Sequence, residues 1–480
     1  MTKMAIDDYN DDFLYEMLRN RDRRFDGRFF FGTVTTGVYC RPVCPIRRPK
    51  RENCVFFESA AKAEKAGFRP CLRCHPEFAP EDGRDPEGPR VVTLAAGFLR
   101  GNEELGEGKI PEISDRLGVS ERHLRRLFLT HYGVNPVQYA QTQKLLFARK
   151  LIFETDLSFT QVAMAANFGS VRRMNALFHE RYGCNPTQMR KEKRIEGGDI
   201  CLRIPYSTPF AWEESLAFLS EGAIDGVEEI VDGEYRRTVA ILSKGKRHKG
   251  WLAVRNEPQA DSLIVKVDEA LIPVTSAVVA RLKKLFDTDC RPEDVEAVLG
   301  ASADLCGTDP GIRIPGSFEP FETAIATVLG RSAANRAATL GEVVSTPFAS
   351  LGRIFPSAGE LFERLREKPL SAAPARVAEA EGRILRELAA AATKGVFEPQ
   401  TDIDDQIAHL AEMQGIGNKA ASHIAMRMLD WPDAFTPADD HVMRAYPGAS
   451  EAEILEKAEA WRPWRAYAAM RLRCRRAGRT

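Results

Sequence analysis

Two short stretches near the start of the chain, GVYCRPVC at residues 37–44 and RPCLRC at residues 69–74, hold four cysteines in two tight pairs. The spacings are C-x3-C and C-x2-C. A short spacing lets both thiolates of a pair turn toward one ion, and two such pairs complete the tetrahedral shell that zinc prefers. The sequence therefore predicts a small zinc domain. Its four predicted ligands are Cys40, Cys44, Cys71 and Cys74.

The N-terminus and the composition indicate a reducing compartment. The opening run MTKMAIDDYNDDF is acidic and has none of the zones of a signal peptide, and no apolar stretch reaches the length of a membrane span. We therefore expect a cytoplasmic protein that does not contact membranes. In that compartment the ten cysteines are not a disulfide framework, and Cys54, between the two pairs, is expected to be a spare thiol.

The cysteine-rich stretch from FFFGTVTTGVYC to RPCLRCHPE, residues 29–77, resembles the N-terminal zinc domain of the Ada methylation sensor. In that family the first cysteine, here Cys40, takes a methyl group from a methylphosphotriester in DNA. A zinc-bound thiolate is nucleophilic without an added base, and its alkylation removes a negative charge that faces the phosphates, so DNA affinity should rise. A purely structural zinc ribbon is the alternative. The candidate phosphate contacts are Arg41, Arg47, Arg48 and Arg69.

A repeated helical unit follows. LFLTHYGVNPVQY from Leu127 and LFHERYGCNPTQM from Leu177 match at several positions, and the residues before each copy have the pattern of a helix-turn-helix with Ser120 or Ser170 as N-cap. Residues 95–190 resemble the AraC-type DNA-binding domain, although Asn167 stands where that family usually has glycine. A helix that carries arginines and an amide can read bases in the major groove. The candidate DNA contacts are Arg122, Arg125, Arg126, Arg172, Arg173 and Asn175.

The pattern changes after residue 200. The segments YRRTVAIL, WLAVR and SLIVKV are short and β-rich, and they predict antiparallel strands. Later, MQGIGNKAASHIAMRML places Gly415 and Gly417 between two helical patterns, which is typical of a helix-hairpin-helix whose backbone N–H groups bind a phosphate. With DAFTPADDHVMRAYPG, PFETAIATVLG and WRPWRAYAAM, the segment from about 200 to 475 resembles the AlkA-type DNA-3-methyladenine glycosylases.

The signature aspartate of that superfamily corresponds to Asp439, and Asp440 is then a surface residue. An ionised aspartate beside the sugar would stabilise the positive charge that develops as the N-glycosidic bond breaks. Lys419 occupies the position that supplies an amine nucleophile in the glycosylases that also nick the strand, although a phosphate-binding or solvated lysine is the alternative. The carbonyl groups of Met413 and Gly415 are candidate ligands for a monovalent cation.

Two further departures from the AlkA-type pattern concern base recognition. Arg331 and Ser332 stand where the residue that wedges into the duplex is expected, and Arg473 replaces an aromatic that stacks on the flipped base. Since an arginine repels a cationic purine, the base preference is expected to differ from that of the family.

Together these features predict a multidomain α+β protein that is mainly helical. The expected units are a zinc domain at residues 10–80, an AraC-type tandem helix-turn-helix domain at 91–195, an antiparallel β-rich AlkA-type subdomain at 200–308 and an all-helical helix-hairpin-helix glycosylase domain at 309–480.

The predicted function joins a methyl-accepting regulator to a base-excision glycosylase, with double-stranded DNA and RNA polymerase as partners. A PCHRV-like run, the second methyl acceptor of the sensor family, is missing from the sequence. The rival hypothesis is a transcription regulator whose glycosylase-like half has lost catalysis.

Overall fold

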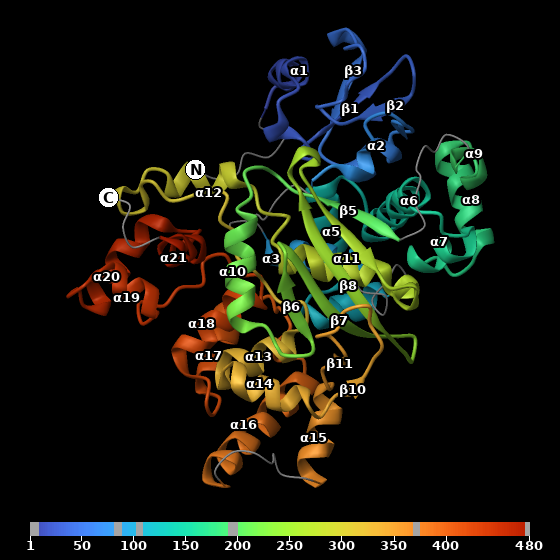
Figure 1. The fold of residues 1–480 in the computed structure, drawn as a ribbon. Coiled ribbons are helices and arrows are strands. Elements are labelled where there is room, and N and C mark those ends of the chain that lie inside the picture. Colours follow the sequence, from blue (N-terminus) through green and yellow to red (C-terminus); the bar gives the residue numbers. More distant parts are fainter. Residues whose placement is uncertain (1–8, 81–88, 102–108, 191–199, 368–374, 476–480) are drawn as a thin grey trace.

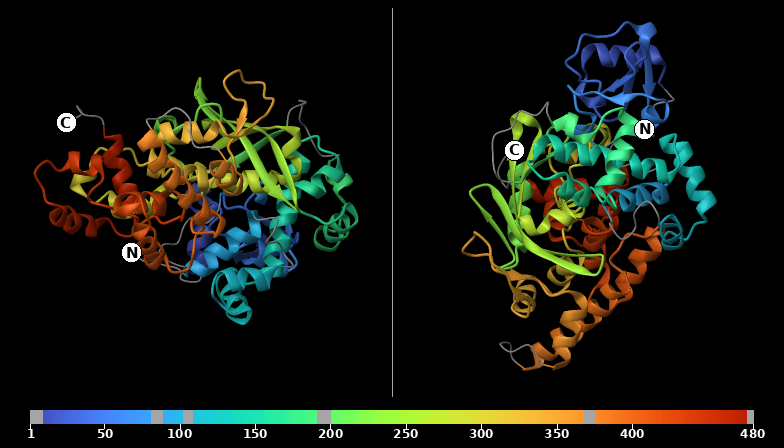
Figure 2. Two further views of the ribbon diagram at one scale, coloured as in Figure 1. Left: turned by 90° about the horizontal axis from the view of Figure 1, so that it is seen from below. Right: turned by 90° about the vertical axis from the view of Figure 1, so that its right-hand side faces the viewer.

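The computed structural model describes residues 9–80, 89–101, 109–190, 200–367 and 375–475. A small lobe at the N-terminus stands apart from the rest of the molecule, and the helical pairs, the sheet and the C-terminal helices are packed against one another below it (Figures 1 and 2). The fold is multidomain and mainly helical, as predicted, and its sheets are antiparallel except for one parallel strand pair in the N-terminal lobe. None of the helices in the described ranges is both long and apolar enough to cross a bilayer.

The N-terminal lobe is a four-stranded sheet with the order β3-β1-β2-β4, flanked by two helices. Gly32 in the central strand lies against two aromatic rings. A Cβ at this position would come within 2.6 Å of Phe68 and 2.9 Å of Phe57. Glycine is therefore required for this sheet to pack. The elements are α1 (Asp11–Asn20), β1 (Phe30–Thr33), β2 (Val38–Cys40), β3 (Cys54–Phe57), α2 (Ala60–Lys65) and β4 (Arg69–Pro70).

Two helix-turn-helix units follow, as the sequence repeat predicts. Ser120 and Ser170 cap their second helices, since each side chain accepts a hydrogen bond from the backbone N–H three residues on. Gly118 and Asn167 occupy the same left-handed turn position, with φ of 66° and 56°. Asparagine tolerates this conformation better than other side chains, so the departure at Asn167 leaves the turn intact. The helices are α3 (Arg90–Gly101), α4 (Ile110–Arg116), α5 (Glu121–Tyr132), α6 (Pro136–Glu154), α7 (Phe159–Ala165), α8 (Val171–Tyr182) and α9 (Pro186–Arg190).

The β-rich unit is a five-stranded antiparallel sheet with the order β5-β9-β8-β7-β6. Its two longest strands, β7 and β8, contain the predicted segments YRRTVAIL and WLAVR, with Thr238 opposite Trp251 and Tyr235 opposite Val254. The third predicted segment, SLIVKV, is β9. The elements are β5 (Cys201–Pro205), α10 (Trp212–Gly222), β6 (Glu228–Val231), β7 (Glu234–Ser243), β8 (Lys246–Glu257), β9 (Ser262–Val267), α11 (Thr275–Leu285) and α12 (Pro292–Leu299).

The C-terminal unit is almost entirely helical and contains the predicted hairpin between α17 and α18. Its elements are α13 (Pro320–Leu329), α14 (Arg331–Ala338), β10 (Glu342–Val343), β11 (Arg353–Ile354), α15 (Ala358–Glu367), α16 (Ala375–Thr393), α17 (Ile403–Glu412), α18 (Gly417–Arg427), α19 (Asp440–Ala445), α20 (Glu451–Ala458) and α21 (Arg465–Cys474). Short 3-10 turns lie between these helices and strands: η2 (Arg23–Phe25), η3 (Arg51–Asn53), η4 (Pro76–Phe78), η5 (Pro258–Ala260), η6 (Glu269–Val274), η7 (Ala303–Leu305) and η8 (Glu459–Trp461).

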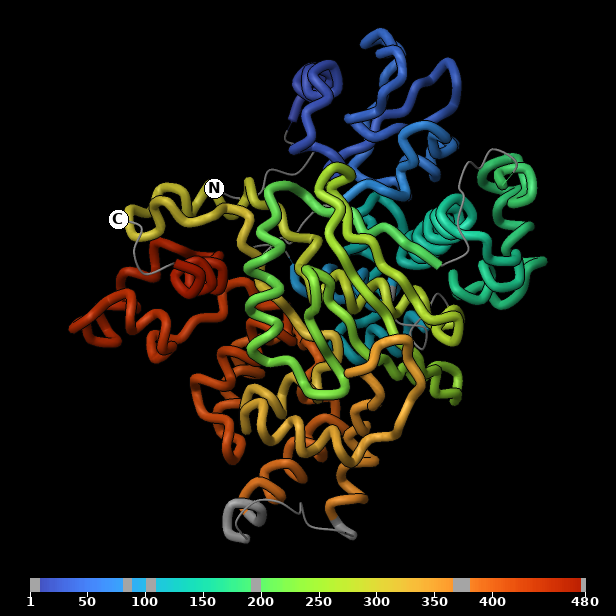
Figure 3. The backbone as a smooth tube through the Cα atoms, in the orientation of Figure 1, coloured from blue at the N-terminus to red at the C-terminus, as the bar shows by residue number. Residues whose placement is uncertain are grey.

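One apolar core extends across residue 200, where the sequence changes from helical to β-rich patterns. Leu151 of α6 and Phe178 and Tyr182 of the second helix-turn-helix lie in one buried cluster with strand residues such as Leu252 and Val265. Figure 3 shows the same arrangement, with the green helical segment beside the sheet. The second helix-turn-helix and the sheet therefore bury their apolar faces against each other.

A buried polar cluster joins the zinc-domain lobe to the second helix-turn-helix. The Glu64 carboxylate accepts hydrogen bonds from the hydroxyl groups of Tyr39 (3.2 Å), Tyr182 (3.1 Å) and Thr142 (2.8 Å). Burial raises the pKa of Glu64 to about 7, although these hydrogen bonds oppose the shift. Tyr39 directly precedes Cys40, and Tyr182 is the last residue of α8. The packing between these two parts is thus fixed by directional bonds.

Candidate functional sites

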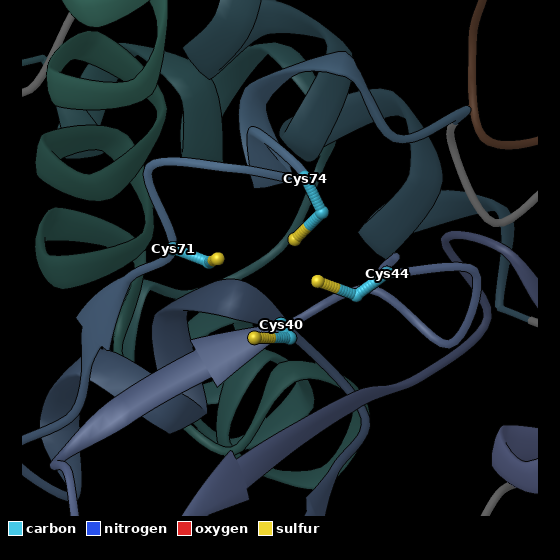
Figure 4. A group of neighbouring side chains, drawn as sticks. All are labelled: Cys40, Cys44, Cys71 and Cys74. Atoms are coloured by element: carbon cyan, nitrogen blue, oxygen red, sulfur yellow. The ribbon is translucent and has the colours of Figure 1, made fainter. Parts of the chain in front are cut away.

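The four predicted zinc ligands come together in the N-terminal lobe. Cys40 ends β2, Cys44 lies in the loop after it, and Cys71 and Cys74 follow β4. All four are buried, their sulfur atoms lie within 4.8 Å of one another, and Figure 4 shows these sulfurs converging on a common space. Zinc with Zn–S bonds of about 2.3 Å separates its ligand sulfurs by about 3.8 Å, so the four residues fit the ion.

The surroundings of the sulfurs favour anionic ligands. The backbone N–H of Arg41 donates to Cys74 Sγ at 3.4 Å, and that of Arg73 donates to Cys71 Sγ at 3.3 Å. Zinc binds cysteine as the thiolate, so a bound ion would keep Cys40 deprotonated at neutral pH. Cys54 is outside the group, and its Sγ donates to the Lys50 carbonyl at 3.4 Å, as expected of a spare thiol.

The arginines expected to contact phosphates differ in their surroundings. Arg47, Arg48 and Arg69 are exposed. Arg41 is largely buried instead: its Nε donates to Asp26 at 2.8 Å and its Nη1 donates to the Cys74 carbonyl at 3.2 Å. The sequence offered no sign of this pair, because Asp26 lies 15 positions away in an irregular segment.

The candidate base-reading residues all lie on the outer faces of α5 and α8. Leu124 and Phe128 point into the core from the first of these helices, and Met174 and Phe178 from the second. The opposite faces carry the exposed cations and the amide. The exposed residues are Arg122, Arg125, Arg126, Arg172, Arg173 and Asn175.

Asp439 is the N-cap of α19, and both of its carboxylate oxygens are held. Oδ1 accepts from the backbone N–H groups of His441 (2.8 Å) and Val442 (3.3 Å), and Oδ2 lies 2.9 Å from His423 Nε2. Burial opposes ionisation of this carboxylate, but the hydrogen bonds from His423 and His441 outweigh it and hold the pKa of Asp439 well below its usual range. The group is therefore an oriented, ionised carboxylate.

The neighbouring residues form a second link between α18 and α19. Asp440 is exposed, and its Oδ1 lies 2.8 Å from Lys419 Nζ. Lys419 and His423 are one helical turn apart on α18, so their side chains contact successive aspartates. Sequence reasoning missed His423, although its spacing of four residues from Lys419 places both on one face.

The hairpin has the expected turn, with φ of 87° at Gly415 and 63° at Gly417. A Cβ at Gly415 would lie 3.1 Å from Ile384, so this position combines a left-handed backbone with close packing. The Met413 carbonyl accepts a hydrogen bond from the Ile416 N–H at 3.1 Å. The monovalent cation at this turn stays a prediction.

The residues that depart from the AlkA-type pattern have partners on other elements. Arg473 lies 4.7 Å from the centre of the Phe218 ring and pairs with Glu221, both on α10. Arg331 pairs with Asp225 at 2.9 Å. The residue in place of the stacking aromatic is therefore a cation that itself stacks on an aromatic ring.

Comparison with known proteins gives three family models along the chain. The family model described as the metal binding domain of Ada matches residues 14–77, a helix-turn-helix domain model matches 113–192, and the AlkA N-terminal domain model matches 201–319. DNA-3-methyladenine glycosylase 2 of Escherichia coli is 28% identical over 285 residues, which cover 56% of this chain and 94% of that protein. The bifunctional transcriptional activator/DNA repair enzyme AdaA of Bacillus subtilis is 28% identical over 186 residues, covering 38% of this chain and 83% of AdaA.

One relative matches the whole arrangement. The "Probable bifunctional transcriptional activator/DNA repair enzyme AlkA" of Mycobacterium tuberculosis is 32% identical over 492 residues, covering 96% of each chain. The fold and the sites thus define a class of protein in which a transcription regulator and a DNA repair enzyme are joined in one chain. The chain belongs to the family of the bifunctional transcriptional activator/DNA repair enzyme AlkA.

Proposed function

We propose that the C-terminal half hydrolyses the N-glycosidic bond of alkylated purines in DNA, and that Cys40 accepts a methyl group from DNA methylphosphotriesters. The observation that carries the first part is the Asp439 carboxylate, which is ionised and held at both oxygens. The names of the relatives support the same assignment.

The glycosylase step follows from the position and charge of Asp439. A base inside a duplex cannot be reached, so the nucleotide must first leave the stack. As the bond from the sugar to the base breaks, positive charge develops on the sugar, and a fixed anion stabilises that charge without reorganising. Water then adds to the sugar, and Asp439 orients it. An alkylated purine is already a cationic leaving group and needs little acid assistance.

We propose that Lys419 does not cleave the strand. A Schiff base requires a neutral amine directed at the sugar carbon, whereas the Lys419 amine is paired with Asp440. In this proposal Lys419 helps to hold α18 against the first turn of α19. Gly415 and Gly417 present backbone N–H groups to a phosphate of the bound strand.

The methyl-transfer step uses the four-cysteine site. Bound zinc would keep Cys40 as a thiolate at neutral pH. The Cys40 sulfur forms a bond to the methyl carbon while the bond from that carbon to the phosphate oxygen breaks, so a thioether and a phosphodiester anion are produced. The thiolate charge thereby moves to the DNA, and binding of the protein to the phosphates becomes stronger.

DNA recognition in this proposal is divided between phosphate and base contacts. Arg47 and Arg69 of the zinc domain contact phosphates, and Arg41 acts through Asp26 and Cys74. The exposed arginines and the asparagine of α5 and α8 read bases of an operator. Transcription activation, which the relatives' names include, implies contact with RNA polymerase.

Two measurements on one zinc-loaded preparation test this proposal. Release of free base from methylated duplex DNA tests the glycosylase, and mass spectrometry of the Cys40 peptide after incubation with methylphosphotriester DNA tests methyl transfer. We expect base release and the added mass of one methyl group on Cys40. If the wild-type protein releases no base from any alkylated purine, the C-terminal half is a scaffold and the rival regulator hypothesis is correct.

A further inference from the structure

A turn of the zinc domain is docked on the C-terminal half of the chain by a buried arginine. Arg291, the residue before α12, donates from Nη2 to the Asp26 carbonyl at 3.0 Å and from Nη1 to the Arg24 carbonyl at 3.2 Å. Its side chain is 1% exposed. A buried guanidinium is costly unless its donors are satisfied, so loss of these two acceptors would destabilise the C-terminal half.

A second contact lies beside the first. Arg28 pairs with Asp294 and lies 3.6 Å from Glu293, both in the first turn of α12. Between these contacts, Gly27 has a φ of 82°, and a Cβ there would lie 1.9 Å from the Pro80 carbonyl oxygen. Only glycine allows this close approach, so the turn between the two contacts depends on this residue.

The same turn reaches the four-cysteine site on its other side. The Asp26 carboxylate accepts from Arg41 Nε at 2.8 Å. The main-chain N–H and Nη1 of Arg41 contact Sγ and the carbonyl of Cys74. Asp26 therefore contacts the metal-ligating loop through its carboxylate and Arg291 through its carbonyl.

Beyond α12 the contacts continue toward Asp439. Glu296 of α12 accepts from Arg471 Nη2 of α21 at 2.9 Å, and the Arg471 side chain is 2% exposed. Helix α21 packs against α19, whose N-cap is Asp439. In Figure 1, α12 lies below the zinc domain and above α21.

We propose that the turn at residues 24–28 and the start of α12 form a coupling surface through which the state of the four-cysteine site acts on the C-terminal half. For the consequence in DNA repair this inference rests on the proposed function. Loss of zinc releases the two loops that carry Arg41 and Cys74. Methyl transfer to Cys40 removes one negative charge from the sulfur cluster to which Cys74 belongs. Either change alters the contact between Arg41 and the Asp26 carboxylate, and through Asp26 the contact between its carbonyl and Arg291. The coupling is reciprocal, as linkage requires.

The tryptophans allow a test that needs no catalysis. All five, at positions 212, 251, 431, 461 and 464, lie in the C-terminal half. Thermal unfolding followed by tryptophan fluorescence therefore reports on that half, together with the helices of the second helix-turn-helix that share its core, and carries no tryptophan signal from the zinc domain. We expect removal of zinc by a chelator to lower the midpoint of this transition in the wild-type protein by roughly 2–4 °C, as for the loss of one or two buried interactions.

Charge-reversal variants test whether the effect of zinc on the C-terminal half passes through the coupling surface. Arg28→Glu should abolish the chelator-induced shift, because it places a carboxylate against Asp294, and the double variant Arg28→Glu/Asp294→Arg should restore it. Arg23→Glu is the matched control: Arg23 pairs with Asp261 across the same boundary but is 72% exposed, so the shift should persist. Zinc content measured on every variant confirms that the site is loaded.

The inference is overturned if chelation leaves the wild-type midpoint unchanged, or if Arg28→Glu shows the full wild-type shift. A zinc-dependent midpoint in a protein that releases no base would refute the proposed glycosylase and leave the coupling standing. Base release by a wild-type protein whose unfolding midpoint does not depend on zinc would support the proposed glycosylase and refute the coupling.

Discussion

Replacement of Asp439 by asparagine separates the catalytic role of the side chain from its structural role. The amide oxygen can still accept from the His441 and Val442 N–H groups, and asparagine is as good an N-cap as aspartate. The variant should therefore keep its fold. What it loses is the charge, together with one acceptor for His423.

The magnitude follows from electrostatics. A unit charge about 4 Å from a developing positive charge contributes about 4 kcal/mol at an effective dielectric constant of about 20. That value corresponds to a decrease of about 10³-fold in the rate of bond cleavage. The assay is the single-turnover release of 3-methyladenine from methylated duplex DNA, with the midpoint of thermal unfolding measured on the same samples.

The neighbouring aspartate provides the control. Asp440→Asn changes the same charge one residue away, where the side chain is exposed and pairs with Lys419, and an exposed pair contributes only about 0.2–1 kcal/mol. We expect less than about a fivefold effect on base release. The reasoning is refuted if Asp439→Asn keeps more than about a tenth of the wild-type rate, since that leaves less than about 1.4 kcal/mol for the charge, or if Asp440→Asn is equally impaired.

Four further predictions address the other sites. Glu64→Gln should flatten the dependence of stability on pH. The raised pKa of Glu64 means that its contribution, up to about 3 kcal/mol, is present below the normal glutamate pKa of 4.5 and is lost as pH rises from there through about 7. Urea midpoints between pH 5 and 8 should therefore fall in the wild type and fall less in the variant. Arg125→Ala should weaken operator binding by about 1–3 kcal/mol with little change in unfolding temperature, measured by titration of labelled promoter DNA; equal weakening on random DNA would mean that Arg125 contacts only phosphate. Cys71→Ser should lose bound zinc on elemental analysis, whereas Cys54→Ser should retain it, and zinc loss from both would contradict the four-ligand site. Borohydride should trap no covalent adduct between Lys419 and an abasic duplex during base release, and a trapped peptide that contains this lysine would show that strand cleavage occurs.

The sequence by itself determined those features whose signal is local. Two cysteine pairs predicted the zinc-type site, and serines before helical repeats predicted the caps at Ser120 and Ser170. Both depend on the spacing of residues that are close together in the chain, where backbone geometry fixes which side chains can meet. The preference for Asp439 over Asp440 came instead from the resemblance of the run DDHVMR to the glycosylase superfamily.

Only the tertiary structure decided the contacts between distant parts of the chain. His423 of α18 reaches Asp439 at the start of α19 across 16 positions, and Arg291 meets Asp26 although 265 positions separate them. Arg41, expected at the DNA surface, is held by Asp26 beside the sulfurs. Such contacts have no periodicity in the sequence, because they arise when separate elements bury their apolar faces together and the polar groups caught between them must find partners.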